Sequence, residues 1–194
     1  MNILLISPKY DSHIIAPHLG LGYLSSNLKK SGHKVKVLDG LREEIIYDPK
    51  DWDLVGVSAM STYFPECCKD ITRAKSYGLK TIIGGPHVIC DPEQSLIDSQ
   101  ADYAASGEGE RTFIQLAAGK EPSQVEGLIY WEDNKPKRSN PDMKNLFEQK
   151  KMYSTKIGNQ SRDFQIDIDD FGEQDWNSID PRSYKIVPHG MIYK

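Results

Sequence analysis

The chain has 194 residues, with 24 lysines and arginines against 28 aspartates and glutamates, and a formal net charge of −4. This length suits one α/β domain with a smaller addition. The acidic balance argues against a protein that binds nucleic acid or an anionic membrane surface through basic side chains. No apolar run is long enough to span a membrane, and the N-terminus lacks the pattern of a signal peptide, so we expect a cytoplasmic protein.

Apolar runs of strand length alternate with helical patterns along the first 120 residues. The strands are expected at residues 3–7, 35–38, 52–58, 79–83 and 102–105. Helical spacing is centred on Leu24, Ile71, Leu96 and Phe113, and a further short helix is expected over residues 41–47. Because strands and helices alternate, we predict an α/β fold. Its core is a doubly wound, five-stranded parallel sheet of the flavodoxin-like or Rossmann-like kind, with strand order 2-1-3-4-5.

The character of the sequence changes near residue 121. Residues 125–131 and 135–138 are expected to pair as a hairpin around Asp133-Asn134. The remainder is polar and irregular, with few large apolar residues. We therefore assign residues 1–120 to a Rossmann-like domain. Residues 121–194 form an extension that packs on that domain or reaches towards something outside the chain.

Gly84-Gly85-Pro86-His87 directly follows the fourth predicted strand. The two glycines remove Cβ atoms, and Pro86 stops the strand, at the sheet edge where open α/β folds bind ligands. A ligand that needs close approach to the backbone would fit here. We expect a leucine at position 85 to fill this space while the fold survives.

Three further loops converge on the same edge. They are Ser7-Pro8-Lys9 with Leu19-Gly20-Leu21-Gly22, then Ser58-Ala59-Met60-Ser61, and then Gly107-Glu108-Gly109-Glu110. Glycines at a helix start suit an anion near free N–H groups, although tight strand–helix packing explains them equally well. Ser61 could simply cap a helix, and acidic residues are favourable at a helix start without any function.

In order and spacing, these loops resemble the N-terminal cobalamin-binding domain of cobalamin-dependent radical SAM enzymes. The matching segments are Leu19–Leu24, Ser31–Val35, Leu54–Ser58, Gly84–His87 with Pro92-Glu93, Gly107–Glu110, and a linker-like stretch from Ile168 to Tyr184. The resemblance implies cobalamin bound base-off, with its dimethylbenzimidazole beside the fourth strand. The cofactor-binding residues it implies are Ser7, Pro8, Lys9, Leu19, Gly20, Gly22, Ser58, Met60, Ser61, Gly84, Gly85, Pro86, His87, Gly107, Glu108, Gly109 and Glu110.

Two departures from related patterns limit this reading. Asp11-Ser12-His13 matches the start of the D-x-H-x-x-G motif that supplies a cobalt ligand, but the glycine is missing. His13 is therefore a candidate axial ligand, against the reading of a surface loop histidine; His18 and His87 are weaker metal candidates. The sequence also lacks the CxxxCxxC motif that holds a [4Fe-4S] cluster, so we expect no catalytic residues in this chain itself.

The leading hypothesis is the cobalamin-binding module of a radical SAM methyltransferase-type enzyme. The resemblance implies that a radical SAM barrel, in cis or in trans, carries the [4Fe-4S] cluster and S-adenosylmethionine. One alternative is a stand-alone cobalamin carrier or sensor. Another is a flavodoxin-like domain that binds FMN or another phosphorylated small molecule, although Gly20-Leu21-Gly22 lacks the third glycine of a dinucleotide fingerprint.

Overall fold

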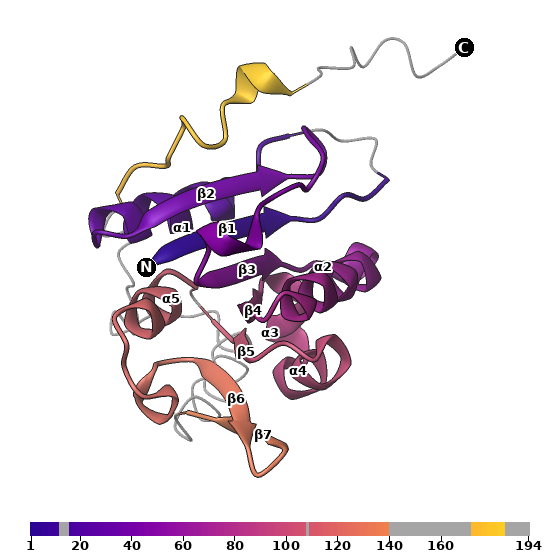
Figure 1. Ribbon diagram of the computed structural model, residues 1–194, viewed down its shortest axis with the longest axis vertical. Helices are drawn as coiled ribbons and strands as arrows, with labels where there is room; N and C mark the ends of the chain where they lie inside the picture. The colour runs from indigo at the N-terminus through magenta and orange to yellow at the C-terminus, as the bar shows by residue number, and fades with distance from the viewer. Residues whose placement is uncertain (12–15, 108, 140–171, 185–194) are drawn as a thin grey trace, which may run out of the picture.

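A single central sheet with helices on both faces forms the body of the protein in the computed structural model (Figure 1), which describes residues 1–11, 16–107, 109–139 and 172–184. The strands are β1 (Asn2–Ser7), β2 (Lys34–Asp39), β3 (Leu54–Ser58), β4 (Lys80–Gly84), β5 (Tyr103–Ala105), β6 (Leu128–Glu132) and β7 (Lys135–Arg138). Their order across the sheet is β2-β1-β3-β4-β5-β6-β7.

The sheet differs from the predicted one in the number of its strands and in the direction of two of them. Strands β1 to β5 pair in parallel, but β6 is antiparallel to β5, and β7 is antiparallel to β6. The sheet is therefore mixed and has seven strands, where the sequence predicts five parallel ones. The predicted hairpin supplies both extra strands, and it covers the edge of β5 that would otherwise stay unpaired.

The helices are α1 (Leu19–Lys30), α2 (Phe64–Ser76), α3 (Pro86–Cys90), α4 (Pro92–Ser99) and α5 (Gly109–Ala117). Helices α1 and α5 cover one face of the sheet, and α2, α3 and α4 cover the other (Figure 1). None of the helices in the described part of the chain has the length and apolar character needed to cross a membrane.

The helix expected over residues 41–47 does not form. The carbonyl oxygen of Asp39 accepts the N–H groups of both Arg42 and Glu43, and the Asp39 carboxylate accepts the N–H of Leu41 at 3.0 Å. These bonds close a local turn at the end of β2. A buried carboxylate acting as a turn acceptor therefore replaces the start of a helix.

The position of β1 in the middle of the covered sheet explains why its sequence is continuously apolar. Ile3 and Leu5 face the core under α1 and α5, whereas Leu4 and Ile6 face the core under α2 and α4. All four side chains are fully buried. A central strand of a doubly covered sheet has no solvent side, and it therefore shows no polar alternation.

The hairpin turn has the predicted chemistry. Asp133 and Asn134 adopt positive φ angles of 50° and 58°, as a two-residue turn between antiparallel strands requires. The hairpin is fastened to α4 by a paired contact between the Arg138 guanidinium and the Glu93 carboxylate, in which Nη2 lies 2.7 Å from Oε2. The Trp131 indole also donates to the carbonyl of Ala101 at 2.7 Å.

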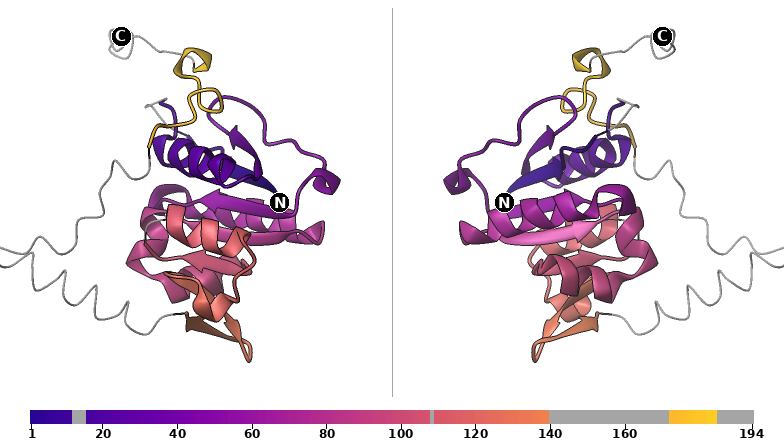
Figure 2. Two further views of the ribbon diagram at one scale, coloured as in Figure 1. Left: turned by 90° about the vertical axis from the view of Figure 1, so that its left-hand side faces the viewer. Right: turned by 90° about the vertical axis from the view of Figure 1, so that its right-hand side faces the viewer.

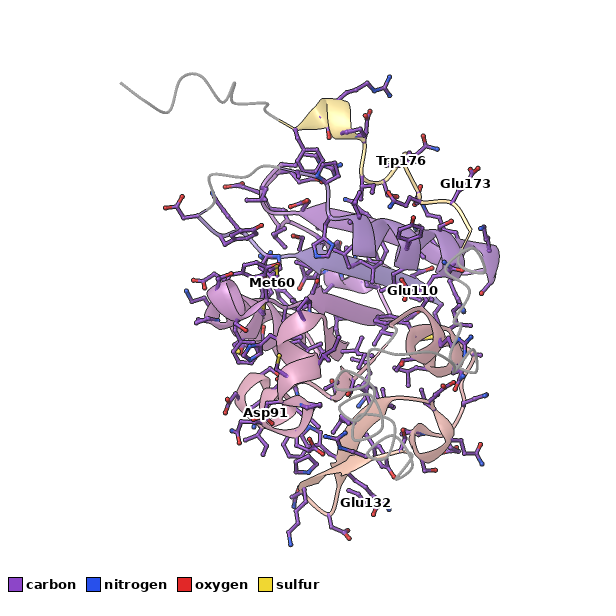
Figure 3. The ribbon with its side chains drawn as sticks, turned by 180° about the vertical axis from the view of Figure 1, so that it is seen from behind. Met60, Asp91, Glu110, Glu132, Glu173 and Trp176 are labelled. Carbon is purple, nitrogen blue, oxygen red and sulfur yellow. The ribbon has the colours of Figure 1, made fainter. Side chains whose placement is uncertain are left out.

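Residues 172–184 lie at the opposite end of the sheet from the hairpin, along α1 and β2 (Figure 2). Ile179 and Tyr184 from this segment are buried in the domain, and Ile179 is part of the core beneath α1. Figure 3 shows Trp176 and Glu173 on the same segment, pointing away from the sheet. This part of the predicted extension therefore packs on the sheet domain.

Candidate cofactor site

A cavity of about 290 Å³ opens at the carboxyl end of the sheet, between α1 and α5. Its floor contains three small residues that lie side by side in the strand register: Ser58 on β3, Gly84 on β4 and Ala105 on β5. Leu5 and Gly56 line it deeper in the sheet. A row of small side chains on one face of a sheet leaves room for a flat group to lie against the strands.

The walls of the cavity come from the two helices and from two loops. Its other lining residues are His18, Gly20, Leu21 and Leu24 at α1, Gly109, Glu110 and Phe113 on α5, and Val57, Gly85, Pro86 and Gly107 near the strand ends. The lining is mostly apolar and has few polar groups, which is typical of a site for an organic cofactor.

Gly84 and Gly56, which both line the cavity, lack side chains for different structural reasons. A Cβ at Gly84 would meet only Ala105, whose Cβ would lie at an ordinary 3.5 Å, so the absent side chain leaves space that belongs to the cavity. A Cβ at Gly56 would lie 2.6 Å from Phe113 Cζ, so this glycine lets the wall residue Phe113 pack on the sheet. Of the two, Gly84 keeps the floor open.

Gly85 is required by the backbone. Its φ of 107° and ψ of −178° lie in a region almost confined to glycine, and a Cβ there would lie 2.7 Å from the carbonyl oxygen of Ala59. Contrary to the expectation from sequence, a leucine at position 85 should therefore destabilise the fold. Gly84 is the position at which a side chain can be added into the cavity.

His18 is the N-cap of α1 and the most informative polar residue of the wall. Its Nδ1 accepts the N–H of Leu21 at 3.2 Å, and its Nε2 lies 2.8 Å from the Ser58 hydroxyl oxygen. Burial lowers the pKa of His18, which favours the neutral imidazole, although the nearby Asp39 carboxylate opposes this shift. Because Nδ1 is an acceptor, Nε2 carries the hydrogen and donates it to Ser58. The Ser58 hydroxyl hydrogen then remains available as a donor at the cavity floor.

Acidification is expected to destabilise the protein through His18. Its pKa is lowered in the folded state, so below about pH 6.5 the unfolded chain binds the proton first and the free energy of unfolding falls. His18→Asn keeps a capping acceptor but cannot be protonated, and it should remove up to about 1.4 kcal/mol per pH unit of this dependence.

Urea unfolding between pH 7.5 and pH 5 measures this effect. Burial and the N-terminal ammonium also lower the pKa of His33, so both proteins should carry His33→Gln. Equal slopes of unfolding free energy against pH in the two proteins would contradict the assignment of His18 as a neutral cap.

The structure brings only part of the predicted site together at this cavity. The predicted residues that line it are Gly20, Ser58, Gly84, Gly85, Pro86, Gly107, Gly109 and Glu110. Those that lie outside its lining are Ser7, Pro8, Lys9, Leu19, Gly22, Met60, Ser61 and His87. Glu108 and His13 lie outside the described residues.

The predicted residues beyond the cavity have other contacts. Met60, Ser61 and His87 lie towards α2, where the His87 ring packs on Phe64 with ring centroids 4.0 Å apart, and its Nδ1 lies 3.0 Å from the Ser61 hydroxyl. Figure 3 shows Met60 and Glu110 on opposite sides of the strand ends. These residues surround the same edge but not the same cavity.

The predicted loop after β1 also turns away from the cavity lining. Ser7 is buried, and the backbone of Pro8 and Lys9 lies so close to Gly40 that a Cβ at Gly40 would overlap it. Gly22 packs directly against the Ile179 side chain, which a Cβ at position 22 would overlap. The Gly-x-Gly signal at the start of α1 therefore combines a cavity residue, Gly20, with a packing residue.

Sequence reasoning missed the apolar lining residues and the capping role of His18. A glycine inside a strand, here Gly56, signals close approach by another group, and that signal was available. The contact between His18 and Ser58 joins residues 40 positions apart, and no local sequence pattern predicts it. Among the described residues there is no group of three or more histidine, cysteine, aspartate or glutamate side chains able to hold a metal ion.

Residues 2–117 match the model of a family described as the B12 binding domain. This chain belongs to the B12-binding domain family. The cavity, the row of small residues and the apolar walls all lie within the matched range. A comparison with the curated proteins gives no match.

Solved structures share the fold of this domain. TsrM from Kitasatospora setae, a radical S-adenosylmethionine methyltransferase with cobalamin and a [4Fe-4S] cluster bound, is 23% identical with a TM-score of 0.61, over 72% of this chain and 31% of that chain. A TsrM structure with tryptophan substrate and the SAM analogue aza-SAM bound is 22% identical with a TM-score of 0.63, over 72% of this chain and 30% of that chain. OxsB, a cobalamin-dependent S-adenosylmethionine radical enzyme with aqua-cobalamin bound, is 19% identical with a TM-score of 0.54, over 72% of this chain and 22% of that chain.

The chain therefore spans less than a third of the length of these solved proteins. At these identities the likeness concerns the fold, while the family match identifies cobalamin as the implied cofactor. The residues present fit such a group. The floor at Gly84 is open because this residue has no side chain, the walls are apolar, and the Ser58 hydroxyl offers one donor between them.

Proposed function

We propose that this chain binds cobalamin base-off, with the dimethylbenzimidazole of its nucleotide tail in the cavity between α1 and α5. The observation that carries the proposal is the row of Ser58, Gly84 and Ala105, because a flat aromatic group needs a floor without large side chains. Leu21 and Phe113 line the same cavity with apolar surface. Burial of an aromatic ring between such walls is favourable by roughly 25 cal/mol per Å² of apolar surface.

The polar groups of the site have roles in this proposal. Ser58, oriented by the His18 imidazole, donates its hydroxyl hydrogen to an acceptor on the tail. Gly109, the first residue of α5, has nothing within 4 Å of its Cβ position and so leaves the helix N-terminus open to the polar parts of the nucleotide. When bound, cobalamin supplies a cobalt ion that can carry a methyl group. The residues of this chain bind and orient it.

We further propose that the module works with a radical SAM domain in a methyltransferase-type enzyme. The support is the fold shared with TsrM, a radical S-adenosylmethionine methyltransferase with cobalamin bound, and with OxsB, a cobalamin-dependent S-adenosylmethionine radical enzyme. The sequence itself contains no CxxxCxxC motif, so the cluster site would belong to the partner domain, in cis or in trans.

Reconstitution tests the proposed ligand directly. The purified protein is incubated with hydroxocobalamin or with FMN, desalted, and measured by visible absorption. We expect about one cobalamin per chain, with the spectrum of the base-off form, and no retained flavin. Retention of FMN with loss of the corrin on desalting would overturn the cobalamin assignment in favour of a flavodoxin-like ligand.

Cobinamide, which has the corrin ring but lacks the nucleotide tail, tests where the tail binds. If the cavity holds the dimethylbenzimidazole, cobinamide should bind at least about tenfold more weakly than cobalamin, a difference of about 1.4 kcal/mol. Isothermal titration of both ligands measures the ratio. Equal affinities would place the tail outside the cavity even if cobalamin itself is retained.

A further inference from the structure

The segment 172–184 is anchored on α1 through Asp175. Its carboxylate accepts hydrogen bonds from the Ser25 and Ser178 hydroxyls, each at 2.6 Å, and it pairs with the Lys29 ammonium. The backbone N–H of Asp175 donates to the carbonyl of Gly22 at 3.1 Å. Burial disfavours the charged carboxylate, but these donors outweigh it and lower the pKa of Asp175 to about 2.

A second anchor of this segment is apolar. Ile179 is fully buried and packs over Gly22 in the first turns of α1, where a Cβ at position 22 would overlap Ile179 Cδ1. The second glycine of the Gly-x-Gly signal is therefore explained by the close approach of this segment. The Arg42 guanidinium also donates to the carbonyl of Ser178 at 3.1 Å, which ties the segment to the turn after β2.

The last described residue of the segment, Tyr184, reaches the residues beside the cavity. Its hydroxyl donates to the buried Asp39 carboxylate at 2.6 Å. The backbone of His18 is close enough to lower the pKa of this phenol slightly, against the larger effects of burial and Asp39. Burial and the Asp39 hydrogen bond raise the pKa of Tyr184, so the phenol stays protonated as a donor. Tyr184 thus holds Asp39, whose carboxylate acts electrostatically on His18, the residue that caps α1 and bonds Ser58.

We propose that Tyr184 is a positioning residue for the cofactor cavity, and that the segment 172–184 clamps the start of α1 so that His18 holds Ser58 in place. Helix α1 is one wall of the cavity, and its first turn has no acidic side chain to help fix it. His18, Asp175 and Tyr184 supply that restraint instead. The proposal rests on the proposed function only for its effect on cobalamin affinity.

Tyr184→Phe tests this role, with Tyr130→Phe as the matched control. Both changes remove one hydroxyl from a buried tyrosine, but Tyr130 lies on β6, away from α1. For Tyr184→Phe we expect cobalamin affinity to fall about three- to tenfold, the range expected for one lost hydrogen bond. Tyr130→Phe should leave the affinity within twofold of wild type, a change of about 0.4 kcal/mol.

Hydrogen exchange separates positioning from general stability and needs no ligand. The Leu21 N–H donates to His18, so its exchange should become at least about threefold faster in Tyr184→Phe. The Ile82 amide in the buried β4 strand reports global unfolding and should change much less. Ile179→Ala loosens the same clamp by a different contact and should reproduce the Leu21 effect.

The outcomes distinguish the two proposals. If the wild-type protein fails to retain cobalamin, the proposed function fails, and the exchange of Leu21 still decides whether the clamp exists. If cobalamin binds but Tyr184→Phe matches Tyr130→Phe in affinity and in Leu21 exchange, the positioning role is overturned. Equal acceleration of Leu21 and Ile82 would also overturn it, because the segment would then only stabilise the whole fold.

Discussion

Gly84→Leu is expected to abolish cobalamin retention in a protein that still folds. The Cβ at this position meets only Ala105, at 3.5 Å, and the rest of the leucine side chain would enter the cavity floor between Ser58 and Ala105. The nucleotide tail would lose its place against the strands. We expect affinity to fall by more than about a hundredfold, or roughly 2.7 kcal/mol.

Visible spectroscopy after desalting measures whether Gly84→Leu retains cobalamin. Thermal unfolding followed by circular dichroism measures whether the variant is folded. Gly84→Ala is the matched control, because its Cβ makes an ordinary contact and it should retain cobalamin. Cobinamide is the control ligand: it has no tail, so Gly84→Leu should bind it as wild type does. Cobalamin binding at wild-type affinity by a folded Gly84→Leu protein would refute the assignment of the tail to this cavity.

Gly85→Ala, one residue along, is expected to destabilise the fold instead. The backbone there lies in a region that costs a residue with a Cβ about 1–3 kcal/mol. The overlap with the Ala59 carbonyl adds a cost of overpacking, typically about 1–3 kcal/mol. Since Ala59 is buried at the end of β3, the backbone has little freedom to move aside.

Chemical denaturation of Gly85→Ala and Gly32→Ala compares a crowded glycine of positive φ with an uncrowded one. Gly32 also has a positive φ, 85°, but nothing lies within 4 Å of its Cβ position, so its substitution reports backbone conformation alone. We expect Gly85→Ala to lose clearly more unfolding free energy than Gly32→Ala. A smaller or equal loss at position 85 would show that the strand end is not held as tightly as the structure indicates.

The alternation of strands and helices and the location of the site at the sheet edge follow from local patterns. The apolar run of β1 is continuous because both faces are covered, and the glycines after β4 mark the edge where the cavity opens. The hairpin was also predictable from Asp133-Asn134. Its pairing with β5 was not, because a local turn signal specifies which two strands meet but not which third strand they join.

The sequence by itself determined the alternating architecture and the ligand-binding edge, with Ser58 and Gly84 near it. Only the tertiary structure decided which glycine serves which purpose: Gly84 opens the cavity, Gly85 permits an unusual backbone angle, and Gly22 admits Ile179. The physical reason is that a missing Cβ looks the same in sequence whatever approaches it. The approaching atom often comes from a distant segment, as Tyr184 does when it reaches Asp39 across 145 positions.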